Sequence, residues 1–305
     1  WNTHQDSQVL TTCTDKQQQQ QQTTHTSTTN GEMMVQLWDV TNVHQPIWTT
    51  GRMPSSNNTP TIVCDPHDPN RIAIATGCDV IWMDLRCAPT SSNTTTMTLK
   101  GCHRYGITDL DANPNRPFVY VTAGQDSLVK FYDIRQLLTK STSSRDSSST
   151  TTATSCTSAL LKIIKGGHTH WVSSVRYNPY HDQLLVTSGT DSLVNLWRMS
   201  SISSAPILEM GEEDEELIMP TTSFGTTNDE NDYYHHYNKN RSSHQQQVEM
   251  PVDTTAPDIN VQKYEHQESV YGTTWIDPWC YVSLSYDGHV VLHHVPSKEK
   301  YKILL

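Results

Sequence analysis

Two stretches of the chain are copies of one another, and this internal repeat constrains the fold more than any other feature. Residues 103–133 read HRYGITDLDANPNRPFVYVTAGQDSLVKFYD and align without a gap with residues 168–198, HTHWVSSVRYNPYHDQLLVTSGTDSLVNLWR. In both copies an Asp follows the His by 23 residues, and an aromatic residue follows the Asp by six. A third copy begins at His266 and is two residues shorter before Asp287. Repeats of this kind indicate a fold of similar units placed side by side.

Weaker copies lie upstream of these three. Residues 61–86, TIVCDPHDPNRIAIATGCDVIWMDLR, end in Met83-Asp84, where the next copy ends in Tyr132-Asp133. Residues 33–41, MMVQLWDVT, match the end of a further copy. For SQVLTTCTD (7–15) we expect a strand either of that copy or of an earlier one.

Each copy consists of short runs of alternating polarity separated by turn residues, which is typical of β-strands. For the copy at 168–198 we expect strands at about 171–177, 184–188 and 193–198, with turns at Asn178-Pro179 and Gly189-Thr190-Asp191. A fourth apolar run follows each copy: MTLKG, ALLKIIKGG, DINVQKYEH and, at the end, YKILL. Four strands per unit at a period of roughly 40 residues predict an all-β fold, the β-propeller.

Polar, low-complexity segments separate the repeats at about 15–31, 139–158 and 201–257. They carry too little apolar surface to offset the entropy of ordering, so we expect disordered insertions. The last of them also explains the net charge of −11, because residues 201–260 hold 12 acidic residues against two basic ones. An acidic chain disfavours nucleic-acid binding, which needs a basic surface.

The seven cysteines are scattered and form no CxxC pair, which argues against a disulfide framework and against a structural zinc site. A reducing compartment, the cytosol or the nucleus, fits best. No apolar run approaches the roughly 18 residues of a membrane span. The first residue is Trp1 and not Met, so we expect a fragment or a misplaced start.

These repeats resemble the WD40 family. The resemblance rests on His168 after two glycines, on Asp191 in a turn and on Trp197 in the following strand. It implies that the His, a strand hydroxyl (Thr187 or Ser188), the Asp and the Trp form a hydrogen-bonded chain inside each blade, which satisfies buried polar groups. The structural residues that it implies are His103, Asp126, Tyr132, His168, Asp191, Trp197, His266 and Asp287.

Departures from the pattern, namely Tyr132 and His293 in place of the Trp, predict blades that are less rigid than average. A complete propeller of this family would have about seven blades. The clearest ones here are about 61–100, 101–136, 159–200 and 258–305, with N-terminal blades missing or degenerate. We treat residues 1–305 as one incomplete propeller. Because an open ring exposes strand edges, we expect low stability or aggregation of the isolated chain.

A metal or catalytic site is the alternative interpretation of the histidines. His168 and His170 could bind a metal only by breaking the blade network, and His293 and His294 are adjacent in a strand and so point to opposite faces. The sequence holds no GxSxG, HExxH or phosphate-binding loop. We therefore expect no enzyme, no catalytic or metal-binding residue, no cofactor and no small-molecule substrate.

The C-terminal third resembles a particular group, the EARP- and GARP-complex-interacting protein family. HWVSSVRYNPYHDQLLVTSGTDSLVNLWR, the acidic GEEDEEL (211–217), YEHQESVYGTTWIDPWCYVSLSYDGHVVLHHVP and KYKILL follow in that family's order. The resemblance implies a non-catalytic adaptor that binds multisubunit vesicle tethers in endosomal recycling and endosome-to-Golgi transport. Such a protein is cytoplasmic, peripheral to endosomes and the trans-Golgi network, with no direct membrane insertion. The alternative is a nuclear WD40 scaffold in a chromatin or ubiquitin-ligase complex.

Propellers bind partners through loops that rigid blades hold in place. The repeat pattern places several large side chains in such loops, although Trp171 and Trp279 could equally pack inside the blades. The candidate partner-binding residues are Tyr105, His170, Trp171, Trp279 and Tyr286.

Overall fold

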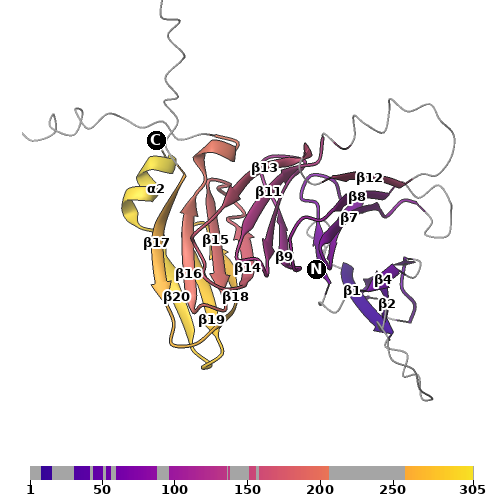
Figure 1. Cartoon of the computed structure of the whole chain (residues 1–305), viewed down its shortest axis with the longest axis horizontal. Helices are drawn as coiled ribbons and strands as arrows, with labels where there is room; N and C mark the ends of the chain where they lie inside the picture. The colour runs from indigo at the N-terminus through magenta and orange to yellow at the C-terminus, as the bar shows by residue number, and fades with distance from the viewer. Residues whose placement is uncertain are drawn as a thin grey trace, which may run out of the picture.

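The computed structural model describes residues 8–15, 31–41, 44–50, 53–55, 60–87, 96–135, 137, 151–155, 158–205 and 258–304. These residues form five β-sheets, which we number 1 to 5 along the chain (Figure 1). The prediction of an all-β fold is confirmed. Sheet 1 holds β1 (Gln8–Asp15), β2 (Gly31–Asp39), β3 (Trp48–Thr49) and β4 (Met53–Ser55), and sheet 2 holds β5 (Thr61–Cys64), β6 (Arg71–Thr76), β7 (Asp79–Asp84), β8 (Thr96–Lys100) and β12 (Thr151–Ser155).

Sheets 3 to 5 correspond to the three clear repeats. In each, consecutive strands pair antiparallel, and in sheets 3 and 4 the fourth strand arrives only after a long insertion. Sheet 3 holds β9 (Ile107–Ala112), β10 (Val119–Gly124), β11 (Val129–Asp133) and β13 (Leu160–Ile164); sheet 4 holds β14 (Val172–Tyr177), β15 (Leu184–Gly189), β16 (Leu193–Arg198) and β17 (Ile259–Glu265); sheet 5 holds β18 (Val270–Asp277), β19 (Cys280–Ser285) and β20 (Val290–His294).

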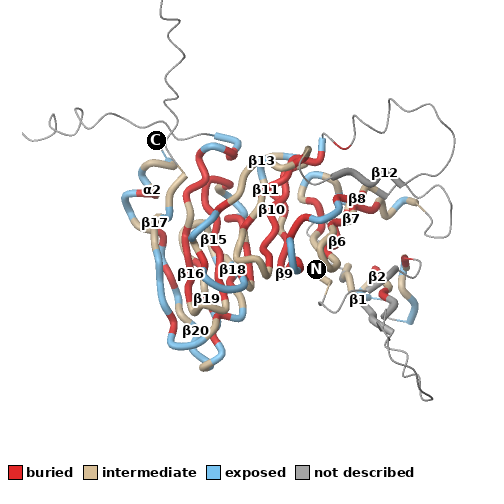
Figure 2. The backbone as a smooth tube through the Cα atoms, viewed as in Figure 1, coloured by how far each residue is buried: buried red, intermediate tan, exposed pale blue. Residues whose placement is uncertain are grey.

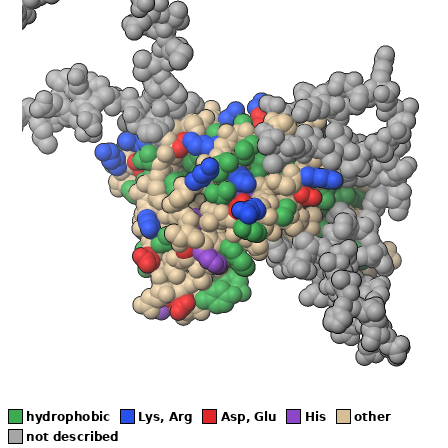
Figure 3. Space-filling model, viewed as in Figure 1, with side chains coloured by type: hydrophobic (Ala, Val, Ile, Leu, Met, Phe, Trp, Pro, Cys, Tyr) green, Lys and Arg blue, Asp and Glu red, His purple; other side chains and the backbone are tan. Residues whose placement is uncertain are grey.

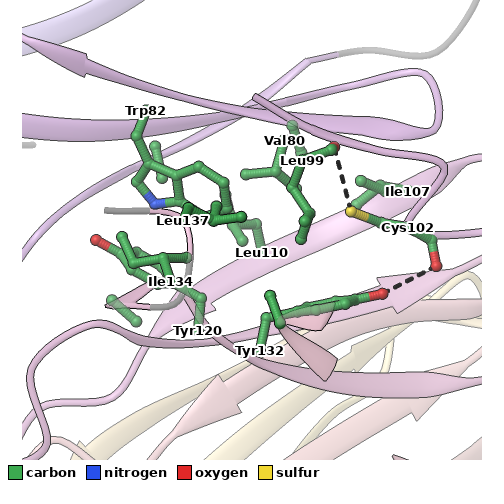
Figure 4. Close-up of a cluster of buried hydrophobic side chains, with 14 residues drawn as sticks. Val80, Trp82, Leu99, Cys102, Ile107, Leu110, Tyr120, Tyr132, Ile134 and Leu137 are labelled. Carbon is green, nitrogen blue, oxygen red and sulfur yellow. Dashed lines mark hydrogen bonds between the residues drawn. The ribbon is translucent and has the colours of Figure 1, made fainter. Parts of the chain in front are cut away.

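The sheets stand in a row and pack face to face, so the core is a series of apolar layers (Figures 1 and 2). The layer between sheets 2 and 3 is shown in Figure 4, where the edge of Trp82 meets the ring of Tyr120 at 5.3 Å between centroids. Phe131 and Tyr177 meet in the same way between sheets 3 and 4. Each sheet thus serves as the support for the next.

Sheet 5 leaves one apolar face uncovered by the described residues. Val194 and Leu196 of β16 are fully buried against sheet 5. The residues at the same repeat positions in β20 are Val290 and Leu292, whose exposed fractions are 66% and 54%. Leu284 of β19 lies beside Val290 and is also exposed. The repeat therefore presents at its last sheet a face that the earlier sheets bury.

The repeated Asn-Pro dipeptide does more than form turns. Asn178 Oδ1 accepts hydrogen bonds from the turn amides that follow it, while its Nδ2 donates to the Pro278 carbonyl of sheet 5 at 2.7 Å. Asn113, at the same position in sheet 3, likewise donates to Asp182 of sheet 4 at 3.1 Å. Each Asn therefore shapes its own turn and ties its sheet to the next.

Three expectations from the sequence are wrong in part. Residues 301–304 of the final run YKILL form no strand but belong to helix α2 (Ser297–Leu304), which starts after Pro296, has Glu299 in its first turn and Lys302 in its last. A negative charge near the N-terminus and a positive charge near the C-terminus interact favourably with the helix dipole. Pro is common at helix starts because it has no backbone N–H to satisfy there. Helix α2 lies at the end of the molecule opposite the β19–β20 turn (Figure 1).

The insertions are also shorter than expected. Within 139–158, Thr151–Ser155 form β12, which pairs in parallel with β8 at the edge of sheet 2. After sheet 4, the 3-10 helix η2 (Ser200–Ile202) continues the fold, and Ser201 binds Asp258 through its amide and its hydroxyl. Residues 16–30, most of 136–150 and 206–257 lie outside the described residues, so the expected disorder there stays a prediction.

Candidate protein-interaction surface

The hydrogen-bonded chain implied by the repeat is complete in sheet 4. His168 Nδ1 lies 3.0 Å from Asp191, and its Nε2 lies 2.8 Å from Thr187 Oγ1. Trp197 Nε1 donates to the same hydroxyl at 2.9 Å, which selects Thr187 over Ser188 as the strand partner. The network fixes the loop before β14 against the β15–β16 turn.

Sheet 3 keeps only part of this chain. His103 binds Asp126 at 2.7 Å and Thr122 at 2.8 Å. Tyr132 takes the position of the Trp, but its hydroxyl donates to the Cys102 carbonyl at 3.0 Å. Burial raises the pKa of Asp126, but the hydrogen bond from His103 and further contacts outweigh it and lower the pKa to about 2.

Sheet 5 builds a different network from the same positions. Ser283 Oγ lies 2.7 Å from Nε2 of both His266 and His293, so His293 stands where Trp197 stands in sheet 4. Asp287 instead binds Ser285 and His289. Of the three predicted aspartates, Asp126 and Asp191 bind their histidines, whereas Asp287 does not bind His266.

Sheet 1 contains a link that the sequence did not reveal. Trp38 Nε1 donates to Thr11 Oγ1 at 2.9 Å, and the register places Thr11 opposite Gln36 as Thr187 lies opposite Asn195. Strand β1 is thus the second strand of the copy that ends in Trp38. The low-complexity residues 16–30 separate the pair, and this hid the repeat.

The loops fall at two opposite ends of the sheets. We call the end with His103, His168 and His266 the histidine end, and the end with the Asn-Pro turns the proline end. At the histidine end, backbone amides of the β10–β11, β15–β16 and β19–β20 turns donate to the loops that precede β9, β14 and β18. These loops are therefore held rigidly in one row.

Large rings are exposed along this row. Tyr105 belongs to the loop of sheet 3, Trp171 to that of sheet 4, and Tyr271 and Tyr286 to sheet 5; their exposed fractions range from 45% to 65%. His170 stacks on Trp171 with centroids 5.4 Å apart, and Tyr271 lies 4.4 Å from Tyr286. Figure 3 shows hydrophobic and His side chains together at the lower end of the molecule, where Figure 1 places the β19–β20 turn.

The rings of sheets 4 and 5 are joined by hydrogen bonds. Thr190 donates its amide to the Trp171 carbonyl and accepts from Ser269 Oγ at 2.9 Å, and the Tyr286 amide donates to the Ser269 carbonyl. The structure thus brings four of the five predicted partner-binding residues, Tyr105, His170, Trp171 and Tyr286, to one end. Sequence reasoning missed Tyr271, because it lies at the start of a strand.

Trp279 does not belong to this surface. It lies in the turn between β18 and β19, at the proline end, and is half-buried. Its ring stacks on His181 with centroids 4.7 Å apart, and Lys300 Nζ lies 5.8 Å from its centroid. Its environment is that of a packing residue between sheets 4 and 5.

The described ranges also bear on metal, disulfide and membrane-spanning sites. There, no three His, Cys, Asp or Glu side chains are grouped as a metal would require. Within the same ranges the cysteines 64, 78, 87, 102 and 280 form no disulfide bond. In that part of the chain no helix has the length and apolarity to cross a membrane.

Comparison with known proteins places this geometry in a family. Residues 50–197 match the family model described as the EIPR1 beta-propeller. "EARP and GARP complex-interacting protein 1" of Rattus norvegicus is 33% identical over 242 residues, which cover 79% of this chain and 50% of the rat protein. The Homo sapiens protein of the same name is 32% identical over the same shares, and "EARP-interacting protein 1" of Caenorhabditis elegans is 30% identical over 78% of this chain and 51% of its own length.

The chain spans about half the length of these curated relatives. The β-propeller model nonetheless agrees with the repeat and with the antiparallel sheets described above. The predicted fold class and the predicted resemblance are both confirmed: the chain is a β-propeller protein of the EARP- and GARP-complex-interacting protein family.

Proposed function

We propose that this chain is part of a non-catalytic adaptor that binds EARP- and GARP-type tethering complexes. The observation that carries the proposal is its similarity to relatives named for interaction with those complexes. The proposed place of action is the cytoplasmic side of endosomes and the trans-Golgi network, in recycling and in transport from endosomes to the Golgi. Nucleic acids and small molecules are not among the proposed partners.

The histidine end is the proposed contact surface. Its exposed rings, Tyr105, Trp171 and Tyr286, are of the residue type that dominates binding energy in protein interfaces. The blade networks hold their loops in fixed positions, so little side-chain or loop entropy is lost when a partner binds. His170 extends this surface beside Trp171.

The test is affinity purification with mass spectrometry. The tagged full-length gene product is expressed in its own cells, as the natural sequence and as the double variant Trp171→Ala/Tyr286→Ala. Recovery of tether subunits with the natural sequence and their loss with the variant are expected. Tyr180→Ala is the matched control, because Tyr180 is 58% exposed but lies in the Asn-Pro turn of sheet 4, at the proline end.

Two results would count against the proposal. Recovery of histones or ubiquitin-ligase subunits in place of tethers would favour a nuclear scaffold on the same fold. If Tyr180→Ala abolishes recovery of the tethers and the double variant does not, the contact surface lies at the proline end. A version truncated before Gln267 removes sheet 5 altogether, and it should also lose the tethers.

A further inference from the structure

Charge is distributed unevenly along the histidine end. Lys100, Arg104 and Lys165 all lie in or beside the loops that follow β8 and β13, and all three are exposed. Within the described residues none of the three forms an ion pair. The Arg104 guanidinium lies over the Tyr105 ring, 5.2 Å from its centroid, while its backbone amide is held by Asp126 at 3.2 Å. The carboxylates on this side, Asp79 and Asp126, accept hydrogen bonds from the backbone amides of Gly101 and Arg104, so the three exposed cations leave an excess of positive charge that can attract an anion.

The other side of the surface has the opposite character. Glu265 at the end of β17 in sheet 4 and Glu268 in the loop before β18 are exposed, and Asp287 is paired with His289 at 3.0 Å; Lys263 is also exposed on β17. Trp171 and the Tyr271–Tyr286 pair are exposed on the loops of sheets 4 and 5. The surface thus changes from mainly cationic at sheets 2 and 3 to aromatic with mainly acidic neighbours at sheets 4 and 5.

We propose that the histidine end binds an extended peptide segment that carries a block of acidic residues next to a block of apolar ones. The acidic block lies on Lys100, Arg104 and Lys165, and the apolar block lies on Trp171, Tyr271 and Tyr286. Complementary charge fixes the direction of the peptide, because its acidic block would meet Glu265 and Glu268 if it were reversed. The apolar block supplies most of the affinity by burying the exposed rings.

The row of loops favours an extended segment over a folded partner domain. The rings belong to three consecutive sheets, and the hydrogen bonds between Trp171, Thr190, Ser269 and Tyr286 keep those of sheets 4 and 5 in a fixed order. A chain that crosses the sheets can place successive side chains on successive blades. This inference rests on the proposed function, since it names the kind of segment through which a tether subunit would bind.

The experiment uses the purified chain and fluorescence polarisation. The probe is a fluorescein-labelled synthetic peptide with a block of Glu and Asp followed by a block of Leu and Pro. The control peptide has the same composition with the acidic residues distributed evenly. Binding of the block peptide about tenfold tighter than the control peptide is expected at low salt, and equal binding of the two would overturn the proposal.

Variants test the two halves of the surface separately. Arg104→Glu/Lys165→Glu should weaken binding by about tenfold at low salt and by less at high salt, because exposed charges are screened. Trp171→Ala/Tyr286→Ala should weaken it by about thirtyfold at either salt concentration. The controls at the proline end, Lys298→Glu and Tyr180→Ala, should leave binding unchanged.

A circular dichroism melt of each variant shows that the fold is retained. Absence of peptide binding by the folded natural chain would overturn the proposal, as would equal losses in the control variants. The outcome is independent of the purification from cells. If tethers are recovered from cells but the peptide does not bind, only this inference is wrong. If the peptide binds but no tethers are recovered, only the trafficking assignment is wrong.

Discussion

Arg198 Nη1 donates to Glu299 Oε2 at 2.9 Å across 101 residues of chain, and both side chains are buried. Arg198 ends β16 of sheet 4, whereas Glu299 lies in the first turn of α2, after sheet 5. The pair therefore fastens the C-terminal helix to the neighbouring sheet. Arg198 Nε has no hydrogen-bond partner among the described residues, so the buried charge of the guanidinium is balanced mainly by the Glu299 carboxylate.

Removing Glu299 should destabilise the chain strongly. Glu299→Ala leaves a buried guanidinium without its counter-charge, and we expect a loss of about 3–5 kcal/mol in the free energy of unfolding. Urea denaturation followed by tryptophan fluorescence measures it. Lys298→Ala changes an exposed neighbour on the same helix and should have little effect. A double variant, Arg198→Met/Glu299→Leu, should recover most of the stability; no recovery would mean that the pair is not the cause.

The strand hydroxyls should differ in importance from sheet to sheet. Thr187 serves both His168 and Trp197, so Thr187→Val should cost about 2–3 kcal/mol. Thr122 binds His103 but has no Trp to satisfy, and Thr122→Val should cost about 1 kcal/mol less. Denaturant midpoints of the two variants make the comparison. Equal costs would show that the third link adds nothing to the network.

Acidification should loosen sheet 5 before the others. Burial, and then the nearby His266, lower the pKa of His293 to about 4, whereas a free imidazole titrates near 6.5. The unfolded state therefore binds the proton more tightly. Stability present above about pH 6.5 is lost as the pH falls toward 4, by an amount on the order of 3 kcal/mol. Hydrogen exchange, corrected for intrinsic rates, should show reduced protection of β19 and β20 at pH 5.

The control for this effect is His293→Trp, which does not titrate and can donate to Ser283 as Trp197 donates to Thr187. Its β19 and β20 amides should keep their protection at pH 5.

Asp111 titrates in the same pH window, but its effect on stability has the opposite sign. Burial raises its pKa to about 6, so its protonation favours the folded state. It lies in sheet 3, so a measurement resolved by sheet separates the two. Uniform loss in all sheets would contradict the prediction.

Gly167 is required by the ring of Trp197. A Cβ at this position would lie 2.4 Å from Trp197 Cζ2, so Gly167→Ala must displace the indole from Thr187. We expect a cost of about 2–3 kcal/mol from overpacking and the strained hydrogen bond. Gly272→Ala is the matched control, since a Cβ there meets nothing within 4 Å. Thermal melts of both variants measure the change in melting temperature, and equal changes in the two would exclude a special role of Gly167.

The uncovered face of sheet 5 should make the isolated chain associate. Leu292 is 54% exposed at a repeat position that is fully buried in sheets 3 and 4. Leu292→Lys should therefore reduce association, measured by light scattering over a concentration series, without lowering the melting temperature. Leu304→Lys alters a similarly exposed leucine on α2 and is the control. A natural chain that melts sharply, reversibly and as a monomer would show that the face is not adhesive.

Most of the fold could be predicted from the sequence because each repeat marks a loop His, a turn Asp and a strand aromatic residue at constant spacing. His168, Asp191 and Trp197 gave the blade network, and the turn residues gave the strand ends within one or two residues. The network of sheet 5 could not be predicted, since it depends on the distance from Ser283 to both His266 and His293. Helix α2 was missed because its apolar residues are as consistent with a strand as with a helix when the run is short.

The candidate surface was predicted less completely. Exposure of Tyr105 and Tyr286 followed from their loop positions. Trp279 also lies in a loop, but at the other end of the sheets, and its packing on His181 depends on how sheet 5 meets sheet 4. Sequence position tells which residues are in loops, whereas the stacking of the sheets decides which loops share an end.

The pairing of Trp38 with Thr11 spans residues 16–30, yet β1 and β2 keep the same register as the other blades. The entropy of closing such a loop grows only with the logarithm of its length, so doubling the number of residues between β1 and β2 would cost about 0.6 kcal/mol. Length changes in the glutamine-rich run, which is only part of this connection, should therefore be nearly neutral for folding. The turn between the second and third strands of a blade is a place where such a tract can lengthen or shorten while the propeller stays the same.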